Sequence, residues 1–400
     1  MKISKICILI LLLPFSFAFI DFLDINTTSV HNHFSLFKIT TIDEQIYWLL
    51  IYLAFTSLIL ISYSITATLK FSYLVSKRID PSNFEKKLNN YVLILLICIA
   101  FYKLINIFYF GFIDYLLLSR AGKVSQGFMG HMVLLFMPLI LSMEFKMNKP
   151  NFYFYVGLLV FTILCAASGY RIHFVVGLTL FAITNFEYIY KFRLKMIIIT
   201  TLIGFSLLTF EMLREQYFGA SYSDRSLLDS LNRTHIISFS AYIDEIDFNL
   251  DLRVFLHAVL SPIEIVLKHF EILNKGDDFF ISNLYTPLFT DYLVWRGTPK
   301  AIATGFSTGF FPTAFIFDKF SGLLVFSILY GLILAIGKKL ITSGSYVSQL
   351  TGAALLGTLV YSNESLIESV KSMMYWLSFI TLIALFINII YIHTKIVRGK

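Results

Sequence analysis

The residues of this sequence best suited to chemistry are arginines that lie apart from its clusters of basic residues. Arginine keeps its charge and presents a planar fork of donors that matches two phosphate oxygens at once. Gathered on one surface, such a set suits a phosphate-containing substrate. The alternative is that each arginine pairs with a nearby acid, such as Asp224, Asp229, Asp244 or Glu245. The set is Arg171, Arg214, Arg225, Arg233, Arg253 and Arg296.

Arg171 carries the strongest signal of this set. It ends the motif Ser168-Gly169-Tyr170-Arg171, a minimal turn between two apolar runs, and a turn that needs only polarity does not need arginine. Arg214 follows Glu211 at the end of another apolar run, where an i,i+3 ion pair is an equal alternative. We predict that Arg171 and Arg214 act in catalysis and that Tyr170 contacts the substrate.

A general base is expected among the carboxylates and histidines of the segment 211–310, but spacing does not separate the candidates. They are Asp244, Glu245, Asp291, His235 and His257. We assign Asp291 to catalysis. The remaining substrate contacts are predicted at Arg225, Arg233, Arg253, Arg296 and His235. The sequence has no spacing typical of a metal site or of a phosphate-binding glycine loop, so we expect neither a metal nor another cofactor.

These residues belong to a very apolar chain. Hydrophobic residues make up 57% of its 400 residues and charged residues 14%, and the mean hydropathy is +0.76. Soluble domains are about 45–50% apolar and about 25% charged, so lipid must cover much of this surface. The net charge of +7 comes from cations scattered between apolar runs, and nucleic acid is therefore not an expected partner.

Apolar runs of about 20 residues mark membrane-spanning helices. We place spans near 4–21, 45–66, 90–110, 127–143, 152–168, 172–190, 196–213, 318–337, 347–362 and 373–392. Residues 1–20 are not followed by a small-residue cleavage site, so we interpret them as an uncleaved first helix rather than a signal peptide. The expected fold is an all-α integral membrane protein with about ten transmembrane helices.

The distribution of lysine and arginine sets the predicted orientation. The segments assigned to the cytoplasmic side hold 14 lysines and three arginines, and the rest of the chain holds eight lysines and seven arginines. Because cytoplasmic loops carry the excess of positive charge, both termini are predicted to be cytoplasmic and the number of spans even. This rule does not explain why arginine is concentrated on the other side.

Three regions follow from this layout. They are an N-terminal transmembrane bundle of about seven spans (1–210), a large external loop containing short helices (211–310), and a C-terminal bundle of about three spans (311–400). The segment 254–267 is apolar but carries His257, Pro262 and Glu264. We therefore expect an interfacial or re-entrant helix there instead of a further span.

The layout resembles that of the Wzy-type O-antigen polymerases, the oligosaccharide repeat-unit polymerases of bacterial surface polysaccharide pathways. Ser168-Gly169-Tyr170-Arg171 is similar to the family's Gly-x-Arg turn between two central helices. The stretch Ala303-Thr304-Gly305-Phe306-Ser307 through Phe320-Ser321-Gly322 is similar to the one by which members leave the large loop. Members often carry Gly-Glu inside that stretch, whereas this chain has Phe311-Pro312-Thr313, so an acidic catalytic role there is not supported.

The resemblance implies a metal-independent glycosyltransferase in the bacterial inner membrane, with the large loop in the periplasm. Its donor and acceptor would be glycans on undecaprenyl pyrophosphate, joined as blocks for lipopolysaccharide biosynthesis with release of undecaprenyl pyrophosphate. The expected partners are these lipid-linked glycans, membrane lipid and a chain-length regulator protein. Preorganised arginines would stabilise the charge that develops on the leaving pyrophosphate.

Other functions remain open for this layout. An O-antigen ligase, which moves the finished chain onto the lipid A core, shares the architecture but typically has more spans and a His-centred loop motif. A polysaccharide transporter or lipid flippase tends to show repeated halves and Gly/Pro-broken helices at matching positions. A non-catalytic membrane scaffold would tolerate alanine at Arg171.

Overall fold

The structure is a computed structural model that describes residues 2–28, 41–69, 82–111, 115, 127–148, 151–168, 171–185, 236–247, 250, 259–260, 263, 309–343, 345–362 and 366–398. Within these residues the secondary structure is helical, apart from isolated bridge residues, of which Leu250 and Phe317 pair in parallel. This agrees with the predicted all-α fold.

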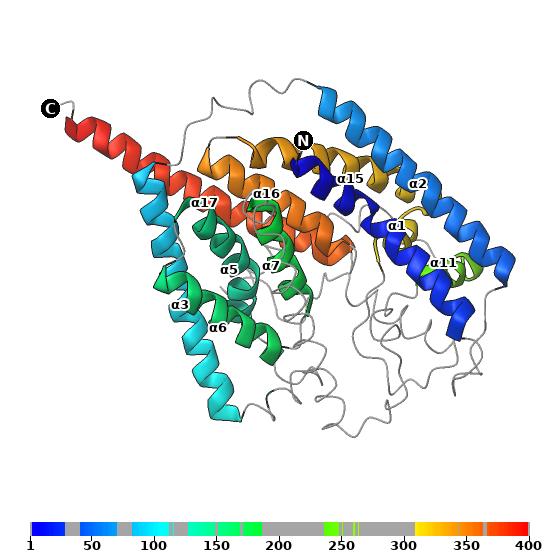
Figure 1. Cartoon of the computed structure of the whole chain (residues 1–400), viewed down its shortest axis with the longest axis horizontal. Coiled ribbons are helices and arrows are strands. Elements are labelled where there is room, and N and C mark those ends of the chain that lie inside the picture. Colours follow the sequence, from blue (N-terminus) through cyan, green and yellow to red (C-terminus); the bar gives the residue numbers. More distant parts are fainter. Residues whose placement is uncertain are drawn as a thin grey trace. The chain divides into compact units, whose positions relative to one another are not determined.

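The helices fall on every predicted span except 196–213, which lies outside the described residues. In the segment 254–267, the described Val259, Leu260 and Ile263 are helical. The helices are α1 (Lys2–Thr28), α2 (Ile42–Thr68), α3 (Asn83–Phe110), α5 (Gly127–Met147), α6 (Phe152–Ser168), α7 (Arg171–Thr184), α11 (Ile236–Glu245), α14 (Phe310–Ile316), α15 (Lys319–Ile341), α16 (Tyr346–Tyr361) and α17 (Leu366–Arg398) (Figure 1).

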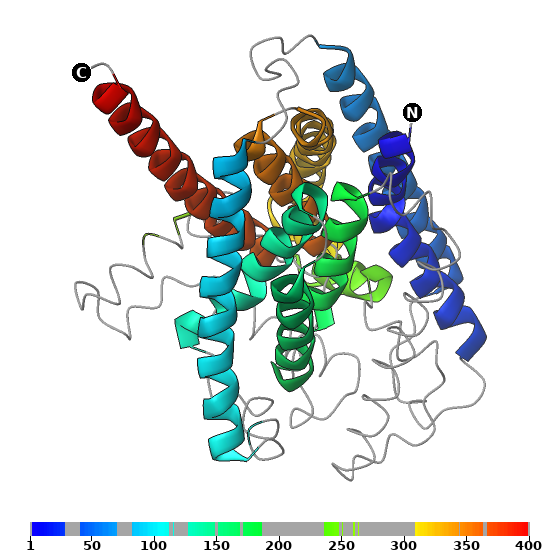
Figure 2. The same ribbon diagram turned by 60° about the vertical axis from the view of Figure 1, so that its left-hand side comes forward.

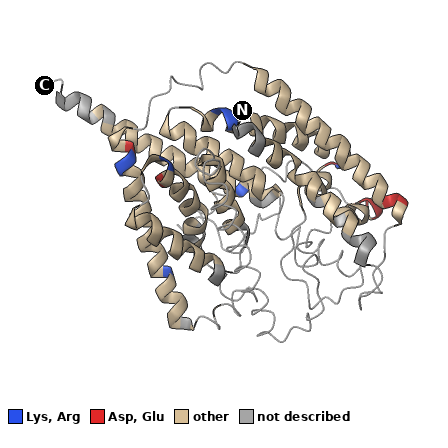
Figure 3. Ribbon diagram, viewed as in Figure 1, with Lys and Arg blue, Asp and Glu red and all other residues tan. Residues whose placement is uncertain are grey.

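Four of these helices contain segments long and apolar enough to cross a membrane: α2, α3, α15 and α17. The middle of α2 and of α15 carries no charged side chain (Figure 3). Large side chains on α2, such as Leu50 and Ile61, are more than half exposed. An exposed apolar face along a helix of this length is suited to lipid.

Reciprocal caps determine where α2 and α3 begin. The Thr41 hydroxyl accepts a hydrogen bond from the N–H of Glu44 at 3.3 Å, and the Glu44 carboxylate accepts one from the N–H of Thr41 at 2.8 Å. Ser82 and Glu85 make the same pair of bonds at 3.2 and 2.7 Å. Each capping box satisfies two backbone donors that a helix start otherwise leaves unpaired.

The chain divides into two compact units. The first comprises residues 1–6, 76–227 and 341–353, and the second comprises residues 7–75, 228–340 and 354–400. In the first unit, α5 is the core, because its residues from Val133 to Met143 are all buried. Helices α3, α6 and α7 pack against it (Figure 2).

A buried carboxylate ties together one end of the first unit. Glu144, at the end of α5, is fully buried, and its oxygens accept hydrogen bonds from the amide groups of Asn89 at 2.6 Å, Asn148 at 2.8 Å and Asn151 at 3.3 Å. The amide oxygen of Asn89 accepts a bond from the hydroxyl of Tyr346 at 2.8 Å. The cluster therefore joins the starts of α3, α6 and α16 to the end of α5.

Asn89→Leu is expected to destabilise the protein by about 1–3 kcal/mol, because it removes one donor to a buried carboxylate and the acceptor of a buried hydroxyl. Tyr346→Phe is the matched control and should cost about 0.5–1.5 kcal/mol, since it removes a single hydrogen bond. The measurement is the midpoint of unfolding in detergent. Equal midpoints for wild type and Asn89→Leu would contradict a stabilising role for the cluster.

In the second unit, α2 and α15 run side by side in the same direction. Near their starts, the rings of Trp48 and Phe315, just before α15, lie 4.9 Å apart. The helices approach closely at Gly331, where a Cβ would lie 2.5 Å from the carbonyl oxygen of Ile59. At their ends, the ammonium of Lys338 donates to the hydroxyl of Tyr63 at 2.7 Å. Small residues permit such close approach of membrane helices.

The short helix α14 precedes α15 and is buried along its whole length. Gly309 directly precedes its first residue and has a φ of 75°, which suits glycine. Two successive residues, Asp318 and Lys319, then take the left-handed conformation, with φ of 63° and 54°. This reversal separates α14 from α15, so the chain enters the long helix through a turn and not as one continuous helix.

Candidate functional site

Helix α11, from the predicted external loop, packs against α2 and α14 in the second unit. Its inner face is buried and includes Ile237, Phe239 and Ile243. Ser240 makes a hydrogen bond with the hydroxyl of Tyr52 on α2, and the Tyr52 ring stacks on Phe311 of α14, with centroids 4.6 Å apart. Aromatic packing and a buried hydrogen bond therefore hold α11 in place.

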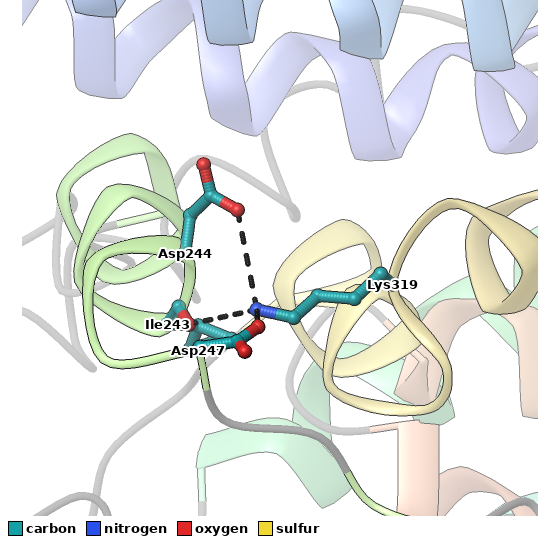
Figure 4. A network of polar contacts seen from close by, with 4 residues as sticks. All are labelled: Ile243, Asp244, Asp247 and Lys319. Carbon is teal, nitrogen blue, oxygen red and sulfur yellow. Dashed lines mark hydrogen bonds and ion pairs between the residues drawn. The ribbon is translucent and has the colours of Figure 1, made fainter.

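Lys319, at the start of α15, reaches the end of α11. Its ammonium group lies 3.9 Å from a carboxylate oxygen of Asp244 and 3.4 Å from one of Asp247, and it donates a hydrogen bond to the carbonyl of Ile243 at 3.1 Å (Figure 4). The same group lies 5.2 Å from the centroid of the Phe315 ring. A cation suits this place, because the end of a helix carries partial negative charge and unpaired carbonyls.

Backbone geometry supports this junction from both sides. Asp247, just beyond α11, has a φ of 49°, and Asp318 and Lys319 are also left-handed, a conformation that residues other than glycine adopt at a cost. The N–H of Leu250 donates to the carbonyl of Ile316 at 2.8 Å. This hydrogen bond joins the segment that follows α11 to the end of α14, close to Lys319 in the sequence.

The exposures of the three side chains separate their roles. The Lys319 side chain is 20% exposed, that of Asp244 is 55% exposed, and that of Asp247 is 94% exposed. The ammonium is thus largely enclosed, while both carboxylates open outward. With two acids around one lysine, this junction does not suit an anion. Its chemistry is that of an oriented carboxylate, which can accept a proton or a hydrogen bond from a hydroxyl.

Few of the predicted site residues fall within the described part of the chain. Arg171 is the first residue of α7, in the first unit, and its backbone alone is described. Among the candidate bases, Asp244 and Glu245 form the end of α11 and are exposed. The others lie outside the described residues: Arg214, Arg225, Arg233, Arg253, Arg296, Asp291, His235, His257 and Tyr170.

Lys319 was not among the residues predicted for the site. It lies at the beginning of the predicted span 318–337. One sequence signal could have indicated it, because Asp318 and Lys319 are the only charged residues between Lys300 and Lys338. The aspartates that contact it lie more than 70 positions earlier in the chain, and only the folded structure brings them to it.

Comparisons with protein-family models, with characterised proteins and with solved structures returned no match.

Proposed function

We propose that this chain is a multi-pass glycosyltransferase of the bacterial inner membrane that joins undecaprenyl-pyrophosphate-linked oligosaccharide repeat units at the periplasmic face. One observation carries the proposal. Seven of the ten arginines lie outside the segments that the charge distribution assigns to the cytoplasm, whereas 14 of the 22 lysines lie inside them. Positive charge on that side runs against the usual bias, and the arginine fork suits a lipid diphosphate.

The proposed topology has about ten spans with both termini in the cytoplasm. Helix direction within each unit supports it independently of charge. In the first unit, the Glu144 cluster gathers the starts of α3, α6 and α16 with the end of α5, and these are all ends that the prediction places in the cytoplasm. In the second unit, the same holds for the ends of α2 and α15, because Lys339 donates to the carbonyl of Thr66 at 3.2 Å.

The proposed chemistry follows from the substrate. The acceptor hydroxyl attacks the anomeric carbon of the donor glycan, the bond from that carbon to the diphosphate oxygen breaks, and undecaprenyl pyrophosphate leaves with the electron pair. Negative charge develops on the diphosphate, and Arg171 and Arg214 are proposed to stabilise it. A carboxylate or histidine of the loop takes the proton of the acceptor hydroxyl.

Deletion of the gene is the test of this proposal. The deletion strain is expected to make lipopolysaccharide that carries a single repeat unit, because the first unit still reaches the core while no second unit is added. Gel electrophoresis of lipopolysaccharide is the measurement, and the plasmid-borne wild-type gene should restore the ladder. Loss of all repeat units would point instead to a ligase or flippase. An unchanged ladder would exclude a role in polymerisation.

A further inference from the structure

Five residues of the loop are candidates for the general base, and the sequence does not rank them. The structure describes two of them, Asp244 and Glu245, both at the end of α11, and Lys319 contacts Asp244. Asp244 is part of α11, which the buried contacts of Tyr52 and Phe239 fix against α2 and α14. A general base must be held within hydrogen-bond reach of the proton that it takes. A carboxylate on a docked helix meets that need.

The contact between Lys319 and Asp244 orients the carboxylate without occupying it. Lys319 is itself fixed, because it also donates to the carbonyl of Ile243 at 3.1 Å and lies over the Phe315 ring. Its distance of 3.9 Å from Asp244 is longer than a hydrogen bond. With half of its side chain exposed, Asp244 keeps acceptor capacity for a hydroxyl of an incoming glycan.

Asp247 differs from Asp244 in each of these respects. It lies beyond the last residue of α11, its side chain is 94% exposed, and it is the closer of the two to Lys319, at 3.4 Å. Its geometry is that of a counter-ion at the surface. Substitution of the two aspartates therefore distinguishes two roles for the cluster. If the cluster is a structural latch, an ion pair that only holds α11 to α15, loss of Asp247 should matter more. If the cluster accepts a proton, loss of Asp244 should matter more.

We propose that Asp244 is the general base of the polymerase reaction and that Lys319 is the residue that positions it, an assignment that rests on the function proposed above. As the acceptor oxygen bonds to the anomeric carbon, its proton passes to a carboxylate oxygen of Asp244. The donor's carbon–oxygen bond breaks at the same centre, and undecaprenyl pyrophosphate leaves with that electron pair. Asp244 afterwards releases the proton to water.

The test uses the full-length protein in lipid vesicles with the undecaprenyl-pyrophosphate-linked repeat unit as both donor and acceptor. Asp244→Asn preserves shape and should lower kcat by about 10²–10⁴-fold, with KM nearly unchanged. Asp247→Asn should lower kcat by less than about fivefold, as expected for a lost surface ion pair. Lys319→Met should lower kcat and Lys319→Arg should restore much of it, because a cation is needed at this place.

Each outcome decides a separate question. If the wild-type protein makes no polymer from this substrate, and the deletion strain keeps a normal ladder, the proposed function is wrong and this assignment falls with it. If the wild-type protein polymerises and Asp244→Asn does too, the assignment alone is wrong. An equal or larger loss in Asp247→Asn would make the cluster a structural latch. Asp244→Glu, which retains a carboxylate, should recover part of the lost kcat; no recovery, with normal amounts of protein in the membrane, would also contradict the assignment.

Discussion

Arg171→Ala is expected to abolish the lipopolysaccharide ladder while the protein still inserts in the membrane. The guanidinium would supply two donors to a diphosphate oxygen pair as charge develops there, and the loss of one such preorganised donor costs about 10²–10³-fold in rate. Arg171→Lys retains the charge without the fork and should recover activity only in part. Arg214→Ala is expected to behave in the same way.

The matched control is Arg193→Ala. Arg193 lies between Lys191 and Lys195, in a segment assigned to the cytoplasm, so its loss should leave the ladder intact. The measurements are the ladder in a complemented deletion strain and the amount of each variant in the membrane. A normal ladder with Arg171→Ala would remove that residue from the reaction, and an equal loss with Arg193→Ala would show a general need for positive charge.

Gly322→Ala is expected to prevent stable folding of the second unit. A Cβ at this position would overlap the carbonyl oxygens of Phe317 and Ala314. These atoms belong to the backbone of α14 and of the residue that follows it, so they cannot move aside as a side chain does. We expect a loss of more than about 4 kcal/mol, which places the change among the largest that single substitutions produce.

Gly157→Ala serves as the comparison, because it adds the same methyl group in a different setting. There the nearest atoms are the ends of two side chains, Leu141 Cδ2 at 3.1 Å and Leu93 Cδ1 at 3.2 Å, which can shift. Alanine also gains about 0.8–1 kcal/mol of helix propensity over glycine. The readout is the amount of folded protein extracted in mild detergent. Similar amounts for the two variants would contradict the tight turn at Gly322.

The helices were predictable from sequence because the physical rule behind them is simple. Backbone groups inside a bilayer must pair within their own segment, so a long apolar run can be read as a helix without tertiary information. Among the described residues, that argument located α1, α2, α3, α5, α6, α7, α15, α16 and α17. It did not predict α11 or α14, because each is too short to be recognised as a span and is a separate helix only through its packing and, for α14, through the left-handed backbone at Asp318 and Lys319.

The candidate site was predictable only in part. Asp244 was among the bases expected in the loop, since its residue type and its place in the chain suffice for that. Its partner Lys319 could not be assigned, because the pair forms between segments that are distant in sequence, through the docking of α11 on Tyr52 and Phe311. The arginine set was predicted from residue type and charge distribution alone. Of its members, the structure describes only the backbone of Arg171.

The shared direction of α2 and α15 limits the number of times that the chain between them can cross the membrane. Two neighbouring helices that cross a bilayer the same way require an odd number of crossings in the intervening chain. Helices α3, α5, α6 and α7, taken as crossings, supply an even number. One more crossing is then needed before α15, and we expect the apolar run at 196–213, which lies outside the described residues, to supply it. On this count we expect the segment 254–267 not to cross, because a further crossing would make the number even and would reverse the direction of α15.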